Sequence, residues 1–526
     1  MHGRWIAWDA GHRLARFRRH RPSRLCPAGV VLGAVLVAAV SAAPVAVAGE
    51  NPVPPAPLTT ERSVLPGLPG VVSEATAAID PHDPRHMAVA ANPYLDPTRI
   101  QVSVSVDAGQ SWSAPITVLP PGESKSYDPQ LGYAADGSLL VTGGASPDTR
   151  SGCQGSSEVF IAALQGDRLS FHILATASAG ALLDRPTLLA TPGSVSGALV
   201  AWTASTGAGA DCLLRPARST THVAVVTPQL GVRTEVVLPP VAQAPFGSAL
   251  AIDGDGVFGL VVAGRDASSG ITVGVYQSAD GVSWQLGRAG TAQAEPDALA
   301  GLGGPVLSMP SIAGLAHGFA VAWTDTTGGT ARTHVARNDT GTWSQVAAPP
   351  ADGTRLLPTL AVVDRTLVLL QAGLSSTGLT YYTWQQVGTG WVALATDAGG
   401  DATHMQELGE LLGLAVGPDA SRLTAVPVTT AGGSALLATA VTPAPVTTTP
   451  PTAASALTSP SAGPSNPPLA VATHQQPHGP GVLTLALAGS GLLLLLIAAG
   501  SAGRRRRRGT GENRRHDPIA PSPDRE

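Results

Sequence analysis

The chain has 526 residues, of which 44% are hydrophobic and 13% are charged, and its formal net charge is −4. Basic residues gather at the two ends, so residues 49–503 hold 17 basic and 31 acidic groups. Because nucleic-acid binding needs clustered cations, this acidic middle argues against nucleic acid as a partner. A single lysine, Lys125, against 31 arginines, with abundant Ala, Gly, Pro and Val, is typical of a GC-rich genome such as an actinobacterial one.

Residues 1–48 have the order of an export signal. Seven arginines and one aspartate come before an apolar run from Ala28 to Ala43, and small residues continue to Ala48. This order predicts a secretory signal peptide cut after Ala48. Its basic region is long, so a retained membrane anchor is the alternative. Residues 49–59 are predicted to be a linker.

A strand–turn–strand pattern returns seven times between residues 60 and 443. Aligned positions in the seven copies are Ala77, Leu131, Thr187, Ala249, Ser311, Thr359 and Leu412. Each copy joins two strands of apolar and β-branched residues through a polar Gly/Asp/Pro turn. Repeats of roughly 50 to 60 residues, with about four strands each, predict an all-β fold, a β-propeller of seven four-stranded blades.

The seventh copy supplies only three strands before the chain becomes rich in proline. The segment from Arg62 to Leu65 resembles the fourth-strand ends of other copies. We therefore expect this N-terminal strand to complete the seventh blade. Such closure of the ring would remove its exposed sheet edges.

Two turns between the third and fourth strands of a copy carry the same motif. It reads SVDAGQSW from Ser105 and, one residue shorter, SADGVSW from Ser278, with incomplete copies that end at Trp343 and Trp391. The aspartate accepts backbone N–H groups, the glycine adopts a positive φ, and the tryptophan packs into the blade edge. The residues with this structural role are Ser105, Asp107, Gly109, Trp112, Ser278, Asp280, Gly281 and Trp284.

The motif resembles the Asp-box (BNR repeat), S-x-D-x-G-x-x-W, of sialidase-like propellers, and the resemblance covers roughly residues 62–443. It implies a propeller fold, and the six blades of catalytic sialidases are the alternative to seven. Sialidases hold a carboxylate with three arginines and use a Tyr–Glu nucleophile pair and an Asp acid/base. Here Arg185 and Arg355 lie in altered versions of the first arginine motif, and no tyrosine has an obvious paired glutamate. The sequence therefore predicts an ectodomain without sialidase turnover.

Residues just before the inner strands are expected to line the central opening. These candidate binding residues are Glu74, Tyr127, Asp128, Asp184, Arg185, Arg355 and Glu410. Asp128 and Asp184 are expected at equivalent places in neighbouring copies. Together with Arg185 and Arg355 they are candidates for acid/base chemistry on a glycoside, and loop capping or pairing with the adjacent arginine is the alternative. The dispersed histidines predict no metal site, and no nucleotide motif predicts a cofactor.

Two cysteines remain after the predicted cleavage, Cys153 and Cys212, in equivalent loops of the second and third copies. In an exported chain they predict a disulfide. Two free thiols are the alternative.

The C-terminal part is expected to attach the propeller to a membrane. Residues 444–480 are rich in Pro, Thr, Ser and Ala, which predicts a disordered stalk. Residues 481–503 are uncharged and long enough for a transmembrane helix. Five arginines begin the 504–526 tail, and they place it in the cytoplasm.

Two functions fit this organisation. The first is a stalked cell-surface head that binds a glycan or a protein ligand without catalysis. The second is a divergent, sialidase-like exo-glycosidase acting on surface glycans. Convergence of Arg185, Arg355 and an acidic pair around one cavity would favour the enzyme.

Overall fold

The structure is a computed structural model. It describes residues 58–68, 71–94, 98–147, 152–191, 197–207, 218–265, 270–293, 309–326, 330–351, 353–375, 378–400, 410–430 and 433–442. The chain divides into two compact units, residues 1–447 and 448–526, and all described residues lie in the first.

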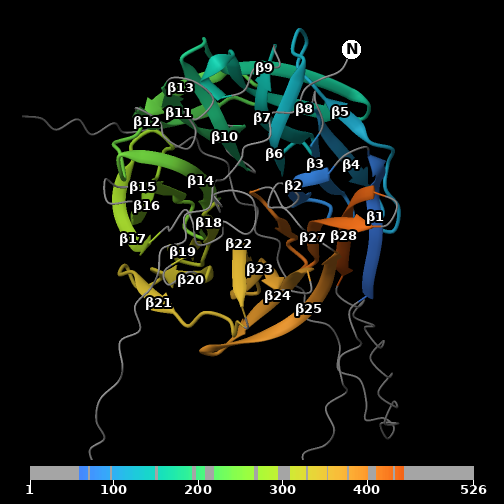
Figure 1. Ribbon diagram of the computed structural model, residues 1–526, viewed down its shortest axis with the longest axis vertical. Helices are drawn as coiled ribbons and strands as arrows, with labels where there is room; N and C mark the ends of the chain where they lie inside the picture. Colours follow the sequence, from blue (N-terminus) through green and yellow to red (C-terminus); the bar gives the residue numbers. More distant parts are fainter. Residues whose placement is uncertain are drawn as a thin grey trace, which may run out of the picture. The chain divides into compact units, whose positions relative to one another are not determined.

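Seven four-stranded antiparallel sheets follow one another around a ring (Figure 1). From the inner to the outer edge, the first blade contains β2 (Val71–Ile79), β3 (Met87–Tyr94), β4 (Ile100–Ser105) and β5 (Ile116–Val118). The second blade contains β6 (Lys125–Tyr133), β7 (Leu139–Ser146), β8 (Ser157–Gln165) and β9 (Arg168–Ala177). The third blade contains β10 (Ala181–Ala190), β11 (Ala198–Thr206), β12 (Arg218–Val226) and β13 (Val232–Val237). A short 3-10 helix, η1 (Gly152–Gln154), lies between β7 and β8.

The remaining four blades repeat this order. The fourth blade contains β14 (Ala244–Ile252), β15 (Phe258–Arg265), β16 (Gly270–Ser278) and β17 (Gln285–Gln293), and the fifth contains β18 (Ser311–Gly314), β19 (Phe319–Asp325), β20 (Arg332–Arg337) and β21 (Ser344–Val346). The sixth blade contains β22 (Thr354–Val363), β23 (Thr366–Ser375), β24 (Gly378–Val387) and β25 (Gly390–Gly400). The seventh contains β26 (Gly413–Val416), β27 (Arg422–Thr430) and β28 (Gly433–Thr442), with β1 (Leu58–Leu68) at its outer edge. The predicted seven-bladed propeller is confirmed, and the six-bladed alternative is wrong.

The ring is closed by the N-terminal strand. β1 pairs antiparallel with β28 from Leu58 opposite Thr442 to Val64 opposite Leu436, and β1 lies beside the C-terminal strands in Figure 1. The seventh blade therefore takes three strands from the end of the propeller and its fourth from the beginning, as the sequence predicts.

The hydrophobic core is divided among the contacts between blades. One buried cluster lies at each of the seven interfaces, for example around Ile100 and Phe160 between the first and second blades, and around Met87 and Leu423 between the first and seventh. A sheet packed on both faces excludes water from β-branched and aliphatic side chains along its whole length. Each blade thus depends on both neighbours for its burial.

The two complete Asp-box turns are held by the same kind of hydrogen bonds. Ser111 N donates to Asp107 Oδ1 at 2.8 Å and Gly109 N donates to Ser105 Oγ at 2.9 Å. In the fourth blade, Val282 N and Ser283 N donate to Asp280 Oδ1 at 2.8 and 2.7 Å. Hydrogen bonds from Ser111 Oγ and Ser111 N lower the pKa of Asp107 to about 2, and those from Ser283 N and Val282 N lower the pKa of Asp280.

Some predicted segments are not tested by this structure. Among the residues it describes, no helix has the length and apolar character needed to cross a membrane. The signal segment 1–48, the stalk 444–480, the apolar segment 481–503 and the tail 504–526 lie outside the described residues. Cys153 is buried in η1, with its Sγ 3.8 Å from the Ser205 carbonyl oxygen of the third blade. Cys212 is outside the described residues.

The Asp-box glycine of the first blade lies against the seventh blade, and this contact leads to a prediction. Gly109 has φ +80°, and a Cβ there would lie 2.7 Å from Ala440 Cβ. We expect Gly109→Ala to lower the free energy of unfolding by about 1–2 kcal/mol from the left-handed backbone and by about 1–3 kcal/mol more from the clash. Urea unfolding measures both.

The matched control is Gly122→Ala, because Gly122 has φ +92° and no atom within 4 Å of its Cβ position. It should lose only the backbone contribution. Equal losses in the two variants would show that the blade contact at Gly109 does not matter.

Candidate functional site

A repeated irregularity shapes the mouth of the central channel. In β2 the register passes from Ser73 opposite Asn92 to Thr76 opposite Ala90, so the inner strand holds one extra residue. The same β-bulge recurs in β6, β10 and β22. A bulge bends the strand and redirects its side chains. These four inner strands thus present redirected side chains at the same level of the ring, and a fifth, β14, also holds one extra residue there, Phe246.

The bulge residues have left-handed backbones. The φ angles of Glu74, Asp128, Arg185 and Leu357 lie between 51° and 56°. Proline follows three of them, and a residue before proline avoids the right-handed helical region. A left-handed residue other than glycine costs about 1–3 kcal/mol and is concentrated at functional sites. Three of the four strained positions carry ionisable side chains.

The sequence prediction misplaced these residues relative to the strands. Glu74, Tyr127, Asp128, Asp184, Arg185 and Arg355 lie within inner strands rather than before them, and only Glu410 precedes its strand. Asp128 is equivalent to Arg185, and Asp184 to Tyr127, so the expected equivalence of the two aspartates is wrong by one residue. The reason is the bulge, whose extra residue interrupts the alternation from which the strand starts were inferred.

Arg185 and Glu410 form an ion pair across the ring. Arg185 Nε and Nη2 donate to the two carboxylate oxygens of Glu410, and Nη1 donates to the Phe246 carbonyl oxygen at 2.6 Å. The arginine is 3% exposed. Its guanidinium therefore links the third blade to the fourth and the seventh, and its paired Nε and Nη2 donors match the two oxygens of the Glu410 carboxylate.

Three more carboxyl groups lie beside this ion pair. Asp184, Asp128 and Glu74 are linked by side-chain hydrogen bonds, and Arg185 N donates to Asp128 Oδ2 at 3.1 Å. We call Glu74, Asp128, Asp184, Glu410 and Arg185 the carboxyl cluster. Four acids share one arginine there, so protons must be retained on some of them.

The pKa values follow from this crowding. Burial, and then the charge of Glu410, raises the pKa of Glu74 to about 7. Burial and neighbouring carboxylates hold the pKa of Asp128 and Asp184 well above the usual range. Asn92, on β3, donates from its amide to Glu74. With a pKa of about 7, the carboxyl group of Glu74 can give up a proton near neutral pH.

Tyr127 and Arg355 differ in their relation to the carboxyl cluster. Burial, and then Asp184 and Asp128, raises the pKa of Tyr127 well above its ordinary value. Arg355 is 5% exposed, and its guanidinium carbon lies 4.3 Å from the ring centroid of Tyr382 on β24. The structure therefore brings together six of the seven candidate residues and directs Arg355 into its own blade.

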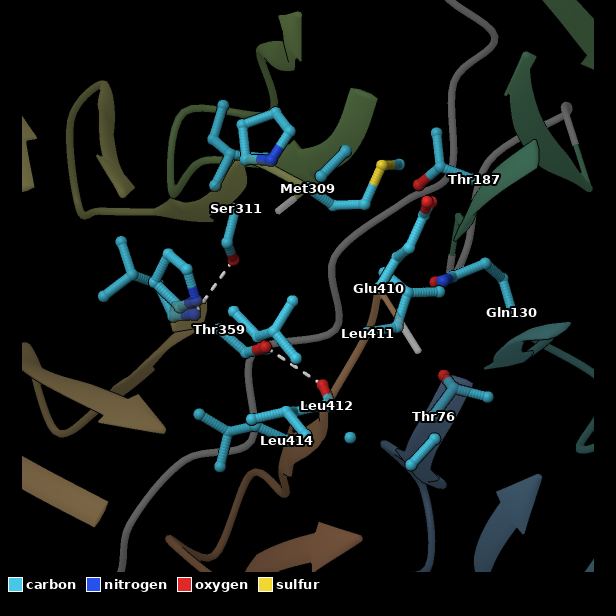
Figure 2. Close-up of a pocket in the computed structure, with 18 of the residues that line it drawn as sticks. Thr76, Gln130, Thr187, Met309, Ser311, Thr359, Glu410, Leu411, Leu412 and Leu414 are labelled. Atoms are coloured by element: carbon cyan, nitrogen blue, oxygen red, sulfur yellow. Dashed lines mark hydrogen bonds between the residues drawn. The ribbon is translucent and has the colours of Figure 1, made fainter. Parts of the chain in front are cut away.

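The central channel below the cluster is a cavity of about 220 Å³ lined by the inner strands of all seven blades. Figure 2 shows Glu410 at its edge, on the side where Thr187 and Gln130 lie. Six blades place a hydrogen-bonding side chain on the channel wall, two residues after the position that the bulge residue Glu74 occupies in the first blade. These side chains are Thr76, Gln130, Thr187, Ser248, Ser311 and Thr359. The seventh blade places Leu412 there.

These channel residues were not predicted as a site. Thr187, Ser311 and Thr359 occupy the aligned positions of the repeats, where hydroxyl groups in an otherwise apolar strand were the available signal. Ser248 is 3% exposed, and its Oγ has no hydrogen-bond partner among the residues that the structure describes. Within the part of the chain that the structure describes, no group of three or more His, Cys, Asp or Glu side chains is arranged to hold a metal ion.

No family model and no curated protein matches the chain. Among solved structures it is similar to the GH93 α-L-arabinofuranosidase of Fusarium graminearum bound to arabinobiose (14% identity, TM-score 0.41, 61% of this chain and 94% of that one). It is also similar to a protein of unknown function from Dyadobacter fermentans (12%, 0.42, 74% and 100%) and to Trypanosoma rangeli sialidase (12%, 0.38, 70% and 55%). The propeller fold rests on the strand pairing described above and not on these distant similarities.

The raised pKa of Glu74 predicts a pH-dependent stability. Between about pH 4.5 and 7 folded Glu74 keeps a proton that the unfolded chain releases, so its contribution to stability falls as pH rises through this window and is lost above it. Glu74→Gln should reduce the loss of unfolding free energy between about pH 5 and pH 8, as measured by chemical denaturation. The pKa values of Asp128 and Asp184 are also raised, so these two residues should still cause the rest of the pH-dependent loss in the variant.

The control is Glu158→Gln on β8, whose carboxylate accepts a hydrogen bond from Thr176 at 3.3 Å and lies outside the cluster. Its pH profile should follow that of the unmodified protein. An unchanged profile in Glu74→Gln would contradict the assigned cause.

Proposed function

We propose that the propeller is a recognition head that binds a neutral, hydroxyl-rich ligand, such as the end of a glycan, in its central channel without cleaving it. The main support is the composition of the channel wall. Six of seven blades supply a hydroxyl or amide side chain, and Glu410 is the one ionisable group among the described residues that line the cavity. A sugar offers many hydroxyls that both donate and accept, and a wall of this kind can pair with them.

Ser248 gives the most specific support. A buried hydroxyl without a partner costs roughly 1–3 kcal/mol, and this one belongs to a residue that lines the channel. A ligand hydroxyl in the cavity would satisfy it. The unpaired group thus marks a place where the folded protein gains from binding.

The arrangement of carboxyls argues against hydrolysis. Glycosidases place two carboxyls on either side of the scissile bond, about 5–10 Å apart. In the carboxyl cluster the acids bond to one another, and the space enclosed with Met309 is about 10 Å³, which is about one water molecule. A sugar ring has no room between them.

Two further features argue against a sialidase. Arg185 already uses its Nε–Nη2 donor pair on Glu410 and one Nη1 donor on the Phe246 carbonyl oxygen. The hydroxyl of Tyr127 has a raised pKa, which makes it a poorer nucleophile at neutral pH. The engaged arginine and the protonated tyrosine both argue against hydrolysis of a sialic acid glycoside.

The second candidate function is a divergent glycoside hydrolase. One observation favours it, the pKa of about 7 at Glu74, which suits a general acid. Release of a chromophore from a panel of neutral glycosides, lost in Glu74→Gln, would establish this function in place of binding.

We also propose that the head is displayed outside the cell. The order of export signal, propeller, stalk, apolar segment and arginine-rich tail supports this topology. The stalk, at about 3 Å per residue, would reach roughly 100 Å. The disulfide between Cys153 and Cys212 is part of this proposal. Export exposes cysteines to oxidising conditions, Cys153 Sγ lies 3.8 Å from the Ser205 carbonyl oxygen of the third blade, and Cys212 belongs to the third repeat of the sequence.

The binding proposal predicts a specific loss in Ser248→Ala. Without its hydroxyl, affinity for neutral methyl glycosides that bind the unmodified head should fall about three- to tenfold, the effect of one neutral hydrogen bond. The unfolding midpoint should not fall, because the lost group is unpaired in the free protein. Isothermal titration calorimetry and thermal unfolding measure the two effects.

Ser344→Ala on the outer strand β21 is the matched control, because Ser344 lies at the far edge of its blade. It should leave affinity unchanged. Failure of the unmodified head to bind any member of a broad glycan panel would contradict the proposal.

The display proposal predicts the product of limited proteolysis. Protease added to intact cells with a permeabilised wall should cut within residues 444–480 and release the head. Mass spectrometry of that fragment without reducing agent should find a peptide pair linked by Cys153 and Cys212. A head that is cut only after lysis would refute the topology, and two alkylated cysteines in the released head would refute the disulfide.

A further inference from the structure

The Asp-box tryptophans fill the grooves between blades. Trp112 packs against the cluster that contains Leu423 and Ala440 of the seventh blade. Trp284 packs on Leu199 and Val225 of the third blade. Trp343 and Trp391 likewise contact clusters with residues of the blade before their own. Four interfaces therefore receive an indole from the turn before the fourth strand or, for Trp391, from the start of the fourth strand β25.

The third blade lacks this tryptophan. Its equivalent turn, residues 227–231, carries Leu230, which packs against the second blade with Leu140 and Ile161. A smaller side chain leaves space that an indole occupies elsewhere. Between the second and third blades the structure has a pocket of about 220 Å³, and its wall includes Leu140, Ile161, Ala198, Val226 and Leu230.

This pocket is separate from the central channel, because the two cavities share no lining residue. Most of its wall is apolar. One exposed carboxylate, Asp136, lies on its lining, and Ser138 N and Oγ donate to Asp136 Oδ1 at 3.0 and 2.5 Å. These hydrogen bonds lower the pKa of Asp136, so the group is ionised at neutral pH.

We propose that the pocket between the second and third blades binds a small planar aromatic molecule of indole size that is neutral or cationic. The volume fits a bicyclic ring, the apolar wall favours its burial, and the position is one that this fold fills with indole at other interfaces. The carboxylate of Asp136 favours a ligand N–H or cation and repels an anionic substituent.

The first test uses indole itself as the probe. Saturation-transfer NMR and calorimetry should detect binding to the complete ectodomain, and indole should raise the unfolding midpoint. Leu230→Trp should supply the missing ring from within, raise the midpoint without ligand, and weaken indole binding at least tenfold. Gln229→Trp places a ring on the same turn but on an exposed residue outside the lining, and it should keep the binding.

A second variant fills the pocket from the other blade and covers the case in which Leu230→Trp does not fold. Ala134→Leu, on the second-blade wall, should also weaken indole binding. Indole-3-acetate should bind more weakly than indole because its carboxylate faces Asp136. No binding of indole to the unmodified protein, equal binding in the filled variants, or tighter binding of the acetate would each overturn the proposal.

Discussion

Main-chain hydrogen bonds between β1 and β28 join the two ends of the propeller, and every other blade contact depends on them. Each of the seven main hydrophobic clusters lies between two blades, so an open ring would leave two sheet faces against water. Such faces and edges are templates for aggregation. The pairing also fixes the ring at seven blades and therefore sets the width of the channel that the inner strands enclose.

The closed ring also explains the strained, left-handed backbone at the mouth of the channel. Inner strands converge near the axis, and a one-residue bulge with a left-handed residue redirects side chains there in four blades. In three of these blades the redirected residue is ionisable, and the fourth has Leu357. The polar groups thus gather on the side of the first, second, third and seventh blades. The opposite side of the mouth is apolar, with Phe246, Met309 and Leu357 at the corresponding places.

Much of the fold was predictable from the sequence, because repetition amplifies a weak signal. One strand–turn–strand pattern is ambiguous, but seven at similar spacing are not, and the turn motif around Asp107 reports a local hydrogen-bond pattern. The site was less predictable. Arg185 and Glu410 are 225 residues apart in the chain, and their pairing depends on which blades face each other across the ring.

The errors have a common cause. A bulge adds one residue without changing composition, so Asp184 was aligned with Asp128 although its structural equivalent is Tyr127. Arg355 has a similar sequence setting to Arg185, yet its strand directs it onto Tyr382. The hydroxyl groups of the channel were overlooked because Ser and Thr are also common in strands for reasons of propensity alone.

The pairing of β1 with β28 also has a consequence for biosynthesis. Residues 58 and 442 are partners, so the ribosome must complete nearly the whole propeller before its first strand finds a permanent neighbour. Closing a loop of this length is entropically costly and slows folding. Until then β1 must stay without its partner strand. Pairing of β28 with β1 would close the ring, and the blades, each less stable alone, would then fold as one cooperative unit.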